Sequence, residues 1–290
     1  MDKFENLKMN GGFWLVGYQY LKLSKWVLSV AITFSAVVGF YLNNEAFSGN
    51  IWFLIAGVFL LSSGASAINQ YVERAQDSIM TRTRNRPLPS GAISPNEALI
   101  FSFITIVIGT TLLTQISIVA TLLGIANVVL YDFVYTPLKY RSQFAILAGG
   151  LVGAIPPLMG WYASGAIGLE SSIVVFATFM FVWQIPHFFL LLIKYRKEYE
   201  LVNTVTVFRN NEEKAPLMFF IWFLATCIVS FMFPLLGILS FAKTIFLYVI
   251  NIGLIALFAL QLYVQPIKIP AFVYMSLHLF LLFHFILLIL

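Results

Sequence analysis

Residues 97–134 read EALIFSFITIVIGTTLLTQISIVATLLGIANVVLYDFV, and this stretch decides the fold class. No charged side chain lies between Glu97 and Asp132. A helix needs roughly 20 apolar residues to cross the hydrocarbon core of a bilayer. The stretch is therefore long enough for two membrane-spanning helices, 97–115 and 117–134, joined by a very short turn.

The rest of the chain repeats this pattern. Of its 290 residues, 60% are hydrophobic and 10% are charged, whereas a soluble domain carries about 25% charged residues. Seven further windows are long and apolar enough to span: 26–43, 50–68, 143–162, 170–193, 216–236, 243–264 and 270–290. We expect a single all-α membrane domain over residues 1–290, a bundle of about nine transmembrane helices around a central cavity.

The basic residues behind the net charge of +5 lie mostly in the segments between the predicted spans. Lysine and arginine concentrate in cytoplasmic loops of membrane proteins. With the N-terminus inside and nine spans, 16 of the 17 basic residues fall inside and only Lys243 falls outside. The inside set is Lys3, Lys8, Lys22, Lys25, Arg74, Arg82, Arg84, Arg86, Lys139, Arg141, Lys194, Arg196, Lys197, Arg209, Lys214 and Lys268. This pattern predicts a C-terminus outside, and it explains the basic balance without a nucleic-acid partner.

The loop after the second span carries acidic and amide side chains at helical spacing. If that helix continues, Asn69, Glu73 and Asp77 lie one turn apart on one face. Two carboxylates and an amide can hold Mg²⁺, which prefers oxygen ligands shared with substrate phosphates. The sequence therefore predicts a magnesium site at the membrane boundary.

Arginines follow this acidic set at once. Arg82, Arg84 and Arg86 lie within nine residues of Asp77. A departing diphosphate needs both a metal and cationic donors as its charge grows. The positive-inside rule alone would explain the arginines as a solvated loop, but it leaves the acidic residues beside them unexplained.

Residues 69–91, NQYVERAQDSIMTRTRNRPLPSG, resemble the signature loop of the UbiA-type intramembrane prenyltransferases. Glu73 in the middle position is similar to the subgroup of that family that farnesylates heme. The resemblance implies Mg²⁺-dependent transfer of a farnesyl group from farnesyl diphosphate to the vinyl group of heme B, with addition of water, giving heme O. It also implies association with a downstream heme A synthase or with oxidase assembly, in the bacterial cytoplasmic membrane.

Three further segments carry the same resemblance. Tyr135-Thr-Pro-Leu-Lys139 resembles the segment whose tyrosine and lysine approach the diphosphate. Trp183-Gln-Ile-Pro-His187-Phe resembles a subgroup motif in the sixth span, where an imidazole could ligate iron. The small residues of 149–154 permit close helix packing, and Pro156 with Pro157 is expected to kink the helix and open a cavity.

These observations give a set of candidate site residues. The expected catalytic residues are Asn69, Glu73, Asp77, Tyr135 and Lys139. The expected metal ligands are Asn69, Glu73, Asp77 and Glu198. The expected substrate-binding residues are Arg74, Arg82, Arg86, Arg141, His187, Lys194 and Glu198. The two remaining histidines, His278 and His284, lack a motif and are expected to be structural.

The chain departs from the family pattern at its second acidic motif. The subgroup shows Lys-Asp-Asp-Tyr where this chain has Arg196-Lys-Glu198-Tyr. One anion stands where a pair is expected, so the number of bound metals stays open. The basic pair after Tyr135 is also split, because Tyr140 lies between Lys139 and Arg141.

Two rival functions stay open. A UbiA-type enzyme could use another acceptor, such as an aromatic quinone precursor or a polar lipid. A carrier or channel would keep charges along a path at the membrane midplane, whereas here nearly all charge lies in loops on one side.

Overall fold

The computed structural model describes residues 12–43, 50–205, 212–264 and 271–290. Within these ranges all regular elements are helical. In the described ranges, eight helices are long and apolar enough to cross a membrane. One of them is composite: α7 (Ile118–Val129) continues through the π-helix η1 (Leu130–Tyr135) into α8 (Thr136–Leu138). The other seven are α4 (Ile51–Val72), α6 (Pro95–Thr114), α9 (Ala145–Ala163), α10 (Ser171–Lys194), α12 (Ala215–Leu235), α13 (Phe241–Val264) and α14 (Ala271–Ile289).

A bent helix pair supplies the remaining span. Helix α2 (Gly12–Leu23) meets α3 (Trp26–Tyr41) with a bend of 55°. Lys25 adopts a left-handed backbone at the bend, with φ of 46°. Counting the pair as one span gives up to nine in the described part of the chain, so the predicted fold class of about nine spans is confirmed.

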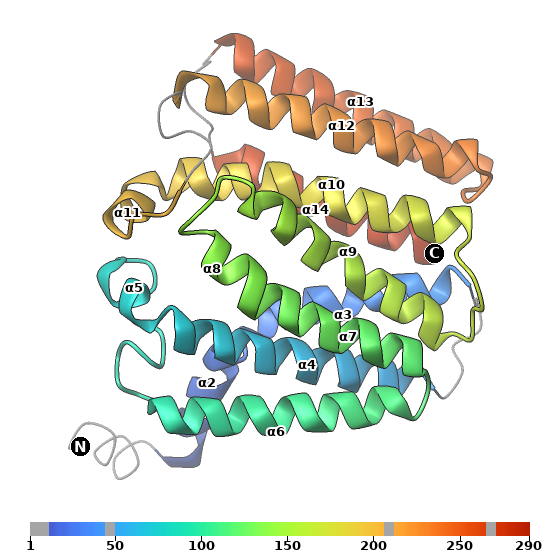
Figure 1. Cartoon of the computed structure of the whole chain (residues 1–290). Helices are drawn as coiled ribbons and strands as arrows, with labels where there is room; N and C mark the ends of the chain where they lie inside the picture. The colour runs from blue at the N-terminus through green and yellow to red at the C-terminus, as the bar shows by residue number, and fades with distance from the viewer. Residues whose placement is uncertain (1–11, 44–49, 206–211, 265–270) are drawn as a thin grey trace.

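The short helices gather at one end of the bundle. Figure 1 shows α5 (Arg74–Ile79), α8 and α11 (Arg196–Leu201) at the same end, next to the C-terminal ends of α4 and α10. The 3-10 turn η2 (Glu212–Lys214) precedes α12. Four of the basic residues assigned above to the inside, Lys3, Lys8, Arg209 and Lys268, lie outside the described residues.

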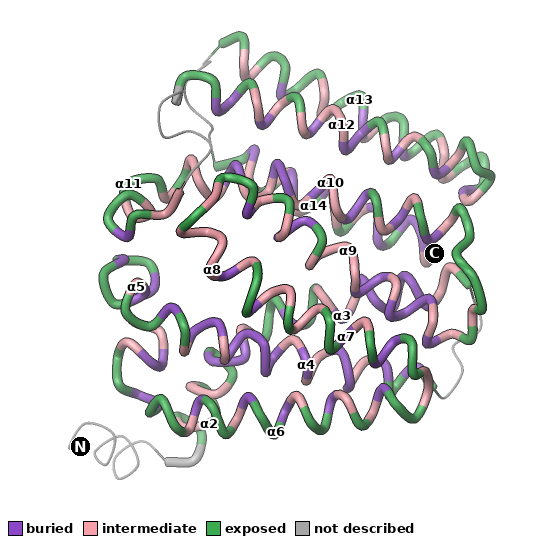
Figure 2. Tube along the Cα trace, viewed as in Figure 1, coloured by how far each residue is buried: buried purple, intermediate pink, exposed green. Residues whose placement is uncertain are grey.

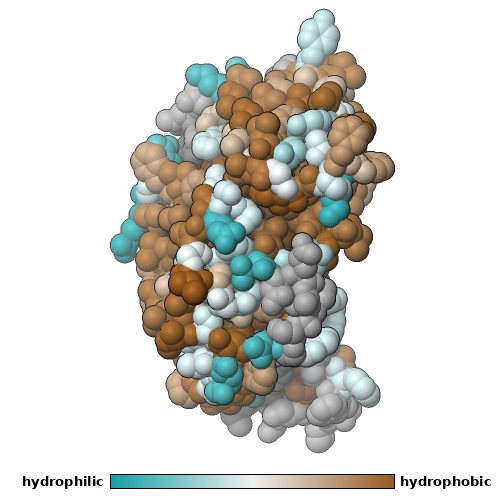
Figure 3. All heavy atoms as spheres, turned by 90° about the vertical axis from the view of Figure 1, so that its right-hand side faces the viewer, coloured by the Kyte–Doolittle hydropathy of each residue, from teal (hydrophilic) through white to brown (hydrophobic). Residues whose placement is uncertain are grey.

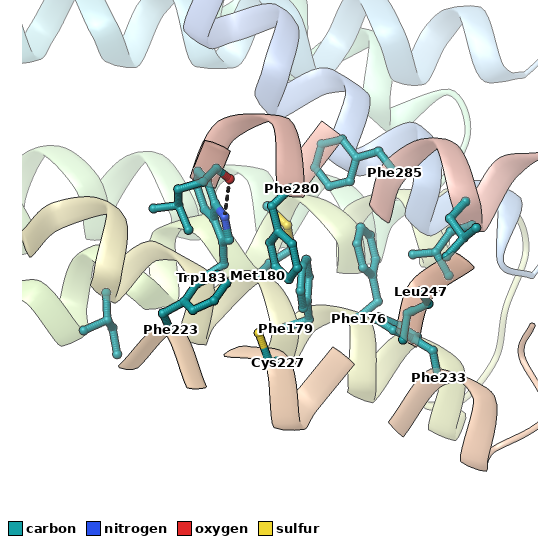
Figure 4. Packing of buried hydrophobic residues seen from close by; sticks show 14 of the residues in the cluster. Phe176, Phe179, Met180, Trp183, Phe223, Cys227, Phe233, Leu247, Phe280 and Phe285 are labelled. Atoms are coloured by element: carbon teal, nitrogen blue, oxygen red, sulfur yellow. Dashed lines mark hydrogen bonds between the residues drawn. The ribbon is translucent and has the colours of Figure 1, made fainter. Parts of the chain in front are cut away.

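Aromatic side chains hold the second half of the bundle together. Phe176 and Phe179 of α10 are fully buried, as are Phe223 of α12 and Phe280 of α14. Figure 4 shows their rings filling the space between these three helices. The cluster extends to Phe285, whose ring meets Phe176 edge-on at 5.9 Å.

The outer surface is apolar where a bilayer would cover it. Exposed residues run along the outward sides of α6, α12 and α13 (Figure 2), and they include Phe103, Ile228 and Phe246. Such sides suit lipid rather than water. Figure 3 shows the end opposite α5 and α11, where hydrophilic and intermediate residues lie among the hydrophobic ones.

Two glycines bring α3 and α9 into backbone contact. A Cβ on Gly160 would lie 1.7 Å from the carbonyl oxygen of Ala36, and one on Gly39 would lie 2.0 Å from that of Pro157. Close helix approach was also predicted for the small residues of 149–154, and it is confirmed against α10. A Cβ on Gly149, Gly150 or Gly153 would lie within 3.0 Å of Phe188, Phe181 or Gln184. Pro156 and Pro157 lie inside α9, which continues through both without a break, and Pro156 lines the cavity described below.

Candidate active site

A cavity of about 420 Å³ opens beside the short helices and extends into the bundle. Along α4 its wall runs from Val58 to Glu73, which is about 22 Å at 1.5 Å per residue. The deep part is mostly apolar, lined among others by Ile32, Leu61, Val128, Val152 and Met159. The mouth is polar, lined by Lys25, Asn69, Glu73, Asp77, Arg82, Arg86, Tyr131, Tyr135, Lys139, Tyr140 and Tyr199.

Asn69, Glu73 and Asp77 all reach this mouth, although not on one continuous helix. Helix α4 ends at Val72, and Glu73 forms the junction with α5. The backbone N–H groups of Glu73 and Asp77 still donate four residues back, at 2.9 and 2.8 Å. The register is thus kept through the junction, and the three side chains are between 1% and 7% exposed.

Both carboxylates are neutralised by neighbouring cations. Arg86 donates to both oxygens of Asp77, at 2.9 and 2.7 Å. Lys139 lies 2.5 Å from Glu73 Oε1, which also accepts from the Tyr140 hydroxyl at 2.8 Å. Charge-assisted bonds of this kind are the strong ones, so each acidic group is fixed on the cavity wall.

Asn69 connects Glu73 to Lys25 through hydrogen bonds. Its Nδ2 donates to Glu73 Oε2 at 2.9 Å and to Thr136 Oγ1 at 3.1 Å. Its Oδ1 accepts from Lys25 Nζ at 2.6 Å. The amide oxygen and the Glu73 carboxylate thus lie side by side, both within reach of one ligand.

The electrostatics keep Glu73 charged and Tyr140 protonated. Burial acts to raise the pKa of Glu73, but the nearby charges of Lys139 and Lys25 outweigh it, and the pKa is lowered. Burial, and then the Glu73 charge, raise the pKa of Tyr140. Tyr140 is therefore a hydrogen-bond donor to a carboxylate and not a base.

The donor set fits a magnesium ion that is shared with a phosphate ligand. In the described ranges, His, Cys, Asp and Glu side chains form no group of three or more that could hold a metal. Two carboxylates and one amide do converge, and Mg²⁺ takes its remaining ligands from water and substrate phosphates. Glu198 does not join them, because it accepts the Arg82 backbone N–H at 3.1 Å and is not among the lining residues.

The expected phosphate-binding cations divide into two groups. Arg82, Arg86 and Lys139 line the mouth, whereas three others do not: Arg74, Arg141 and Lys194. The guanidinium of Arg74 lies 4.5 Å from the Tyr71 ring and donates to the Tyr71 carbonyl. Lys194 lies over the Tyr195 and Tyr274 rings, and Arg141 is exposed. A ring contact alone does not separate the two groups, because the Arg82 guanidinium lies 4.7 Å from the Tyr195 ring and still lines the mouth.

The two remaining predicted residues present aromatic rings to the cavity. Tyr135 lines the cavity, and its ring packs 5.8 Å from that of Phe188. His187 also lines the cavity. His284, in contrast, is fully buried with both ring nitrogens bonded, to Ser230 and to the Phe280 carbonyl.

Several site residues escaped the sequence reasoning. Lys25, Tyr131, Tyr140 and Tyr199 line the mouth without having been assigned to it. Asp132 is not among the lining residues, but it is 3% exposed within η1 and neither of its oxygens has a hydrogen-bond partner. An ionisable residue inside a span marks a functional position by default, so Asp132 could have been found from its place in an apolar run.

Comparison with known proteins shows which family this chain resembles. The model of the UbiA prenyltransferase family matches residues 28–284. A mitochondrial protoheme IX farnesyltransferase from Yarrowia lipolytica is 41% identical over 66% of this chain, and one from Geobacter sulfurreducens is 39% identical over 57%. The matched segments span 41% and 61% of these two relatives' own lengths.

Solved structures share the fold at low sequence identity. Digeranylgeranylglyceryl phosphate synthase superposes with a TM-score of 0.77 at 18% identity, covering 94% of this chain and 97% of its own. A UbiA homolog from Archaeoglobus fulgidus, bound to GPP and Mg²⁺, has a TM-score of 0.62 at 16% identity, covering 94% and 100%. With eight or nine apolar spans in its described part and a family match over residues 28–284, this chain is a multi-pass integral membrane protein that belongs to the UbiA prenyltransferase family.

Proposed function

We propose that this protein transfers the farnesyl group of farnesyl diphosphate to the vinyl group of heme B, with addition of water, to give heme O. The observation that carries the proposal is the cavity, which has a cationic mouth above an apolar interior. An isoprenyl diphosphate has the same division between a charged end and a hydrocarbon tail. The names of the relatives, protoheme IX farnesyltransferases, support heme as the acceptor.

The mouth supplies the charge that the diphosphate requires. Four cations face two carboxylates among its lining residues. The cations are Lys25, Arg82, Arg86 and Lys139. Asn69, Glu73 and Asp77 would hold Mg²⁺, which would stabilise the negative charge of the leaving diphosphate. Once these oxygens turn to a metal, Lys25 and Lys139 are free to bind phosphate oxygens.

The interior supplies a place for the allylic cation. The bond between the farnesyl C1 and the diphosphate oxygen breaks, and its electron pair leaves with the diphosphate. Tyr135 and Phe188 present aromatic rings to the cavity, and ring faces stabilise a cation. The vinyl π electrons of the acceptor then form the new carbon–carbon bond, and water adds to the resulting cation beside the porphyrin with loss of a proton.

The acceptor would lie toward α10, where His187 lines the cavity. An imidazole is a common axial ligand of heme iron. We place the N-terminus and the end with α5 and α11 on the cytoplasmic side of a bacterial inner membrane, from the basic residues there. In that membrane, the protein would associate with a downstream heme A synthase or with oxidase assembly, which would receive the apolar product.

The reaction tests the proposal directly. Purified protein is incubated with heme B, farnesyl diphosphate and Mg²⁺, and the porphyrin product is weighed by mass spectrometry. A product that has gained one farnesyl group and one water supports the proposal. Unchanged heme, alongside prenylation of an aromatic acid or a polar lipid under the same conditions, would assign the enzyme to another acceptor.

A further inference from the structure

Two histidines from different helices meet at the cavity wall. The ring centroids of His187 on α10 and His278 on α14 lie 4.9 Å apart, and the ring planes cross at 76°. His187 lines the cavity, whereas His278 is not among the lining residues. His278 is therefore placed to act on a ligand only through His187.

The ring of His278 is itself held in place. Its Nδ1 lies 2.7 Å from the carbonyl oxygen of Tyr274, one helical turn earlier. A carbonyl oxygen only accepts hydrogen bonds, so Nδ1 is the donor in this contact. The Tyr274 ring also packs on the imidazole, with centroids 4.4 Å apart. The orientation of His278 is thus set by its own helix.

A second ring holds His187 from another side. The indole of Trp183, one turn earlier on α10, stacks on the His187 imidazole at 5.1 Å and 16°. The indole Nε1–H donates to the carbonyl of Leu277 on α14 at 3.2 Å, the bond drawn beside Trp183 in Figure 4. The imidazole of His187 is therefore held between a stacked ring and a perpendicular one, both tied to α14.

The ring contacts of His187 take the place of the hydrogen bond that usually orients a metal-binding histidine. A metal-binding histidine generally donates its second ring N–H to a carboxylate, carbonyl or water, which orients the ring. Nδ1 of His187 is buried and has no hydrogen-bond partner. The orientation of this imidazole consequently depends on its ring neighbours.

We propose that His278 is a positioning residue for the acceptor, because its ring holds the His187 imidazole in the orientation that meets the heme iron. This inference rests on the proposed function, in which heme B is the acceptor. Loss of a partner that orients a metal-binding histidine costs about 10–100-fold in affinity. We expect an effect near the lower end, since Trp183 would still hold one face of His187.

The test is a heme titration of the full-length protein in detergent micelles, followed by absorption. The variants are His278→Ala, His278→Phe and the control Leu279→Ala, whose side chain is 56% exposed on the same helix. We expect His278→Ala to bind heme about tenfold more weakly, with a shifted and broadened Soret band. His278→Phe keeps a flat ring and should stay within about twofold of wild type, as should Leu279→Ala. Binding of farnesyl diphosphate with Mg²⁺, measured by calorimetry, should be unchanged in all three.

A folded His278→Ala variant with wild-type heme affinity and Soret band would overturn the inference. So would a His278→Phe variant that loses as much affinity as the alanine variant. Thermal unfolding is followed in parallel, and if His278→Ala is unstable, His278→Leu, which fills the space without a flat ring, replaces it. Failure of the proposed function looks different, because wild-type protein then binds no heme and forms no farnesylated heme product. Heme binding by His187→Ala equal to that of wild type would overturn the ligand role of His187, and with it this inference, while leaving the enzymatic product unchanged.

Discussion

Arg86 donates hydrogen bonds to both carboxylate oxygens of Asp77, at 2.9 and 2.7 Å, at the mouth of the cavity. The carboxylate is 1% exposed, and removing one partner of a buried ion pair leaves the other charge uncompensated. In the proposed function, the pair keeps the carboxylate that would bind Mg²⁺ beside the cation that would bind phosphate.

Asp77→Asn should abolish turnover while the protein stays folded in the membrane. The amide preserves the shape and can still contact Arg86, but it removes the charge that balances Mg²⁺. We expect product formation to fall by about 100-fold or more, the scale of losing one group that stabilises transition-state charge. Ser78→Ala, at the neighbouring exposed position, is the matched control. Near-normal turnover of Asp77→Asn at physiological Mg²⁺ would exclude this group of residues as the metal site.

Lys25→Ala should weaken the binding of farnesyl diphosphate. Lys25 Nζ donates to Asn69 Oδ1 at 2.6 Å inside the mouth, whereas Lys22, on the preceding turn, lies over the exposed Tyr18 ring. A buried charge-assisted bond to phosphate contributes about 1.5–3 kcal/mol, so we expect about a tenfold or greater loss in affinity by calorimetry. The same substitution at Lys22 should have little effect. Equal losses in the two variants would mean that Lys25 acts only through general surface charge.

The spans and the acidic loop could be predicted because their signals are local. Continuous apolar runs fix the helices, and Asn69, Glu73 and Asp77 keep helical register even across the junction at Glu73. The cations at the cavity mouth were harder to predict, because Arg74 and Arg82 are equally basic in the sequence. Only the packing shows that Arg74 lies over Tyr71 while Arg82 faces the cavity.

Contacts between distant helices could not be predicted at all. Lys25 reaches Asn69 only because α3 packs on α4, 44 residues further along the chain. His278 meets His187 through the closure of α14 against α10. No spacing in one sequence encodes such a juxtaposition.

The orientation of the bundle can be tested by labelling. Single cysteines are placed at Asn85, exposed in the loop after α5, and at Ile167, 99% exposed between α9 and α10. We expect a membrane-impermeant thiol reagent added outside intact cells to modify Ile167→Cys only. The natural Cys227 is fully buried and should stay unmodified. Modification of both cysteines from the same side would refute the proposed topology.

Ser230→Ala should destabilise the second half of the bundle. The Ser230 hydroxyl lies 2.7 Å from His284 Nε2 and accepts from Asn251 Nδ2 at 3.3 Å, so one network joins α12, α13 and α14. All three residues are fully buried, and an unsatisfied buried polar group costs about 1–3 kcal/mol. We expect a lower unfolding temperature in detergent, with the binding of farnesyl diphosphate retained. Thr178→Ala, exposed on α10, should unfold like wild type, and an equally stable Ser230→Ala would show that the network contributes nothing.

Gly160→Ala should disrupt the crossing of α3 and α9. The added methyl would lie 1.7 Å from the carbonyl oxygen of Ala36 and 2.8 Å from the backbone nitrogen of Phe40. Because backbone and not a flexible side chain blocks it, the helices must separate, and overpacking of this kind costs typically about 1–3 kcal/mol, occasionally more. Separation would also shift Met159, which lines the cavity one residue away. We therefore expect both a lower unfolding temperature and a weaker affinity for farnesyl diphosphate. Gly253→Ala on α13, where a Cβ meets no atom within 4 Å, is the matched control and should be neutral or slightly stabilising. If the two variants unfold at the same temperature, the α3–α9 contact does not depend on glycine.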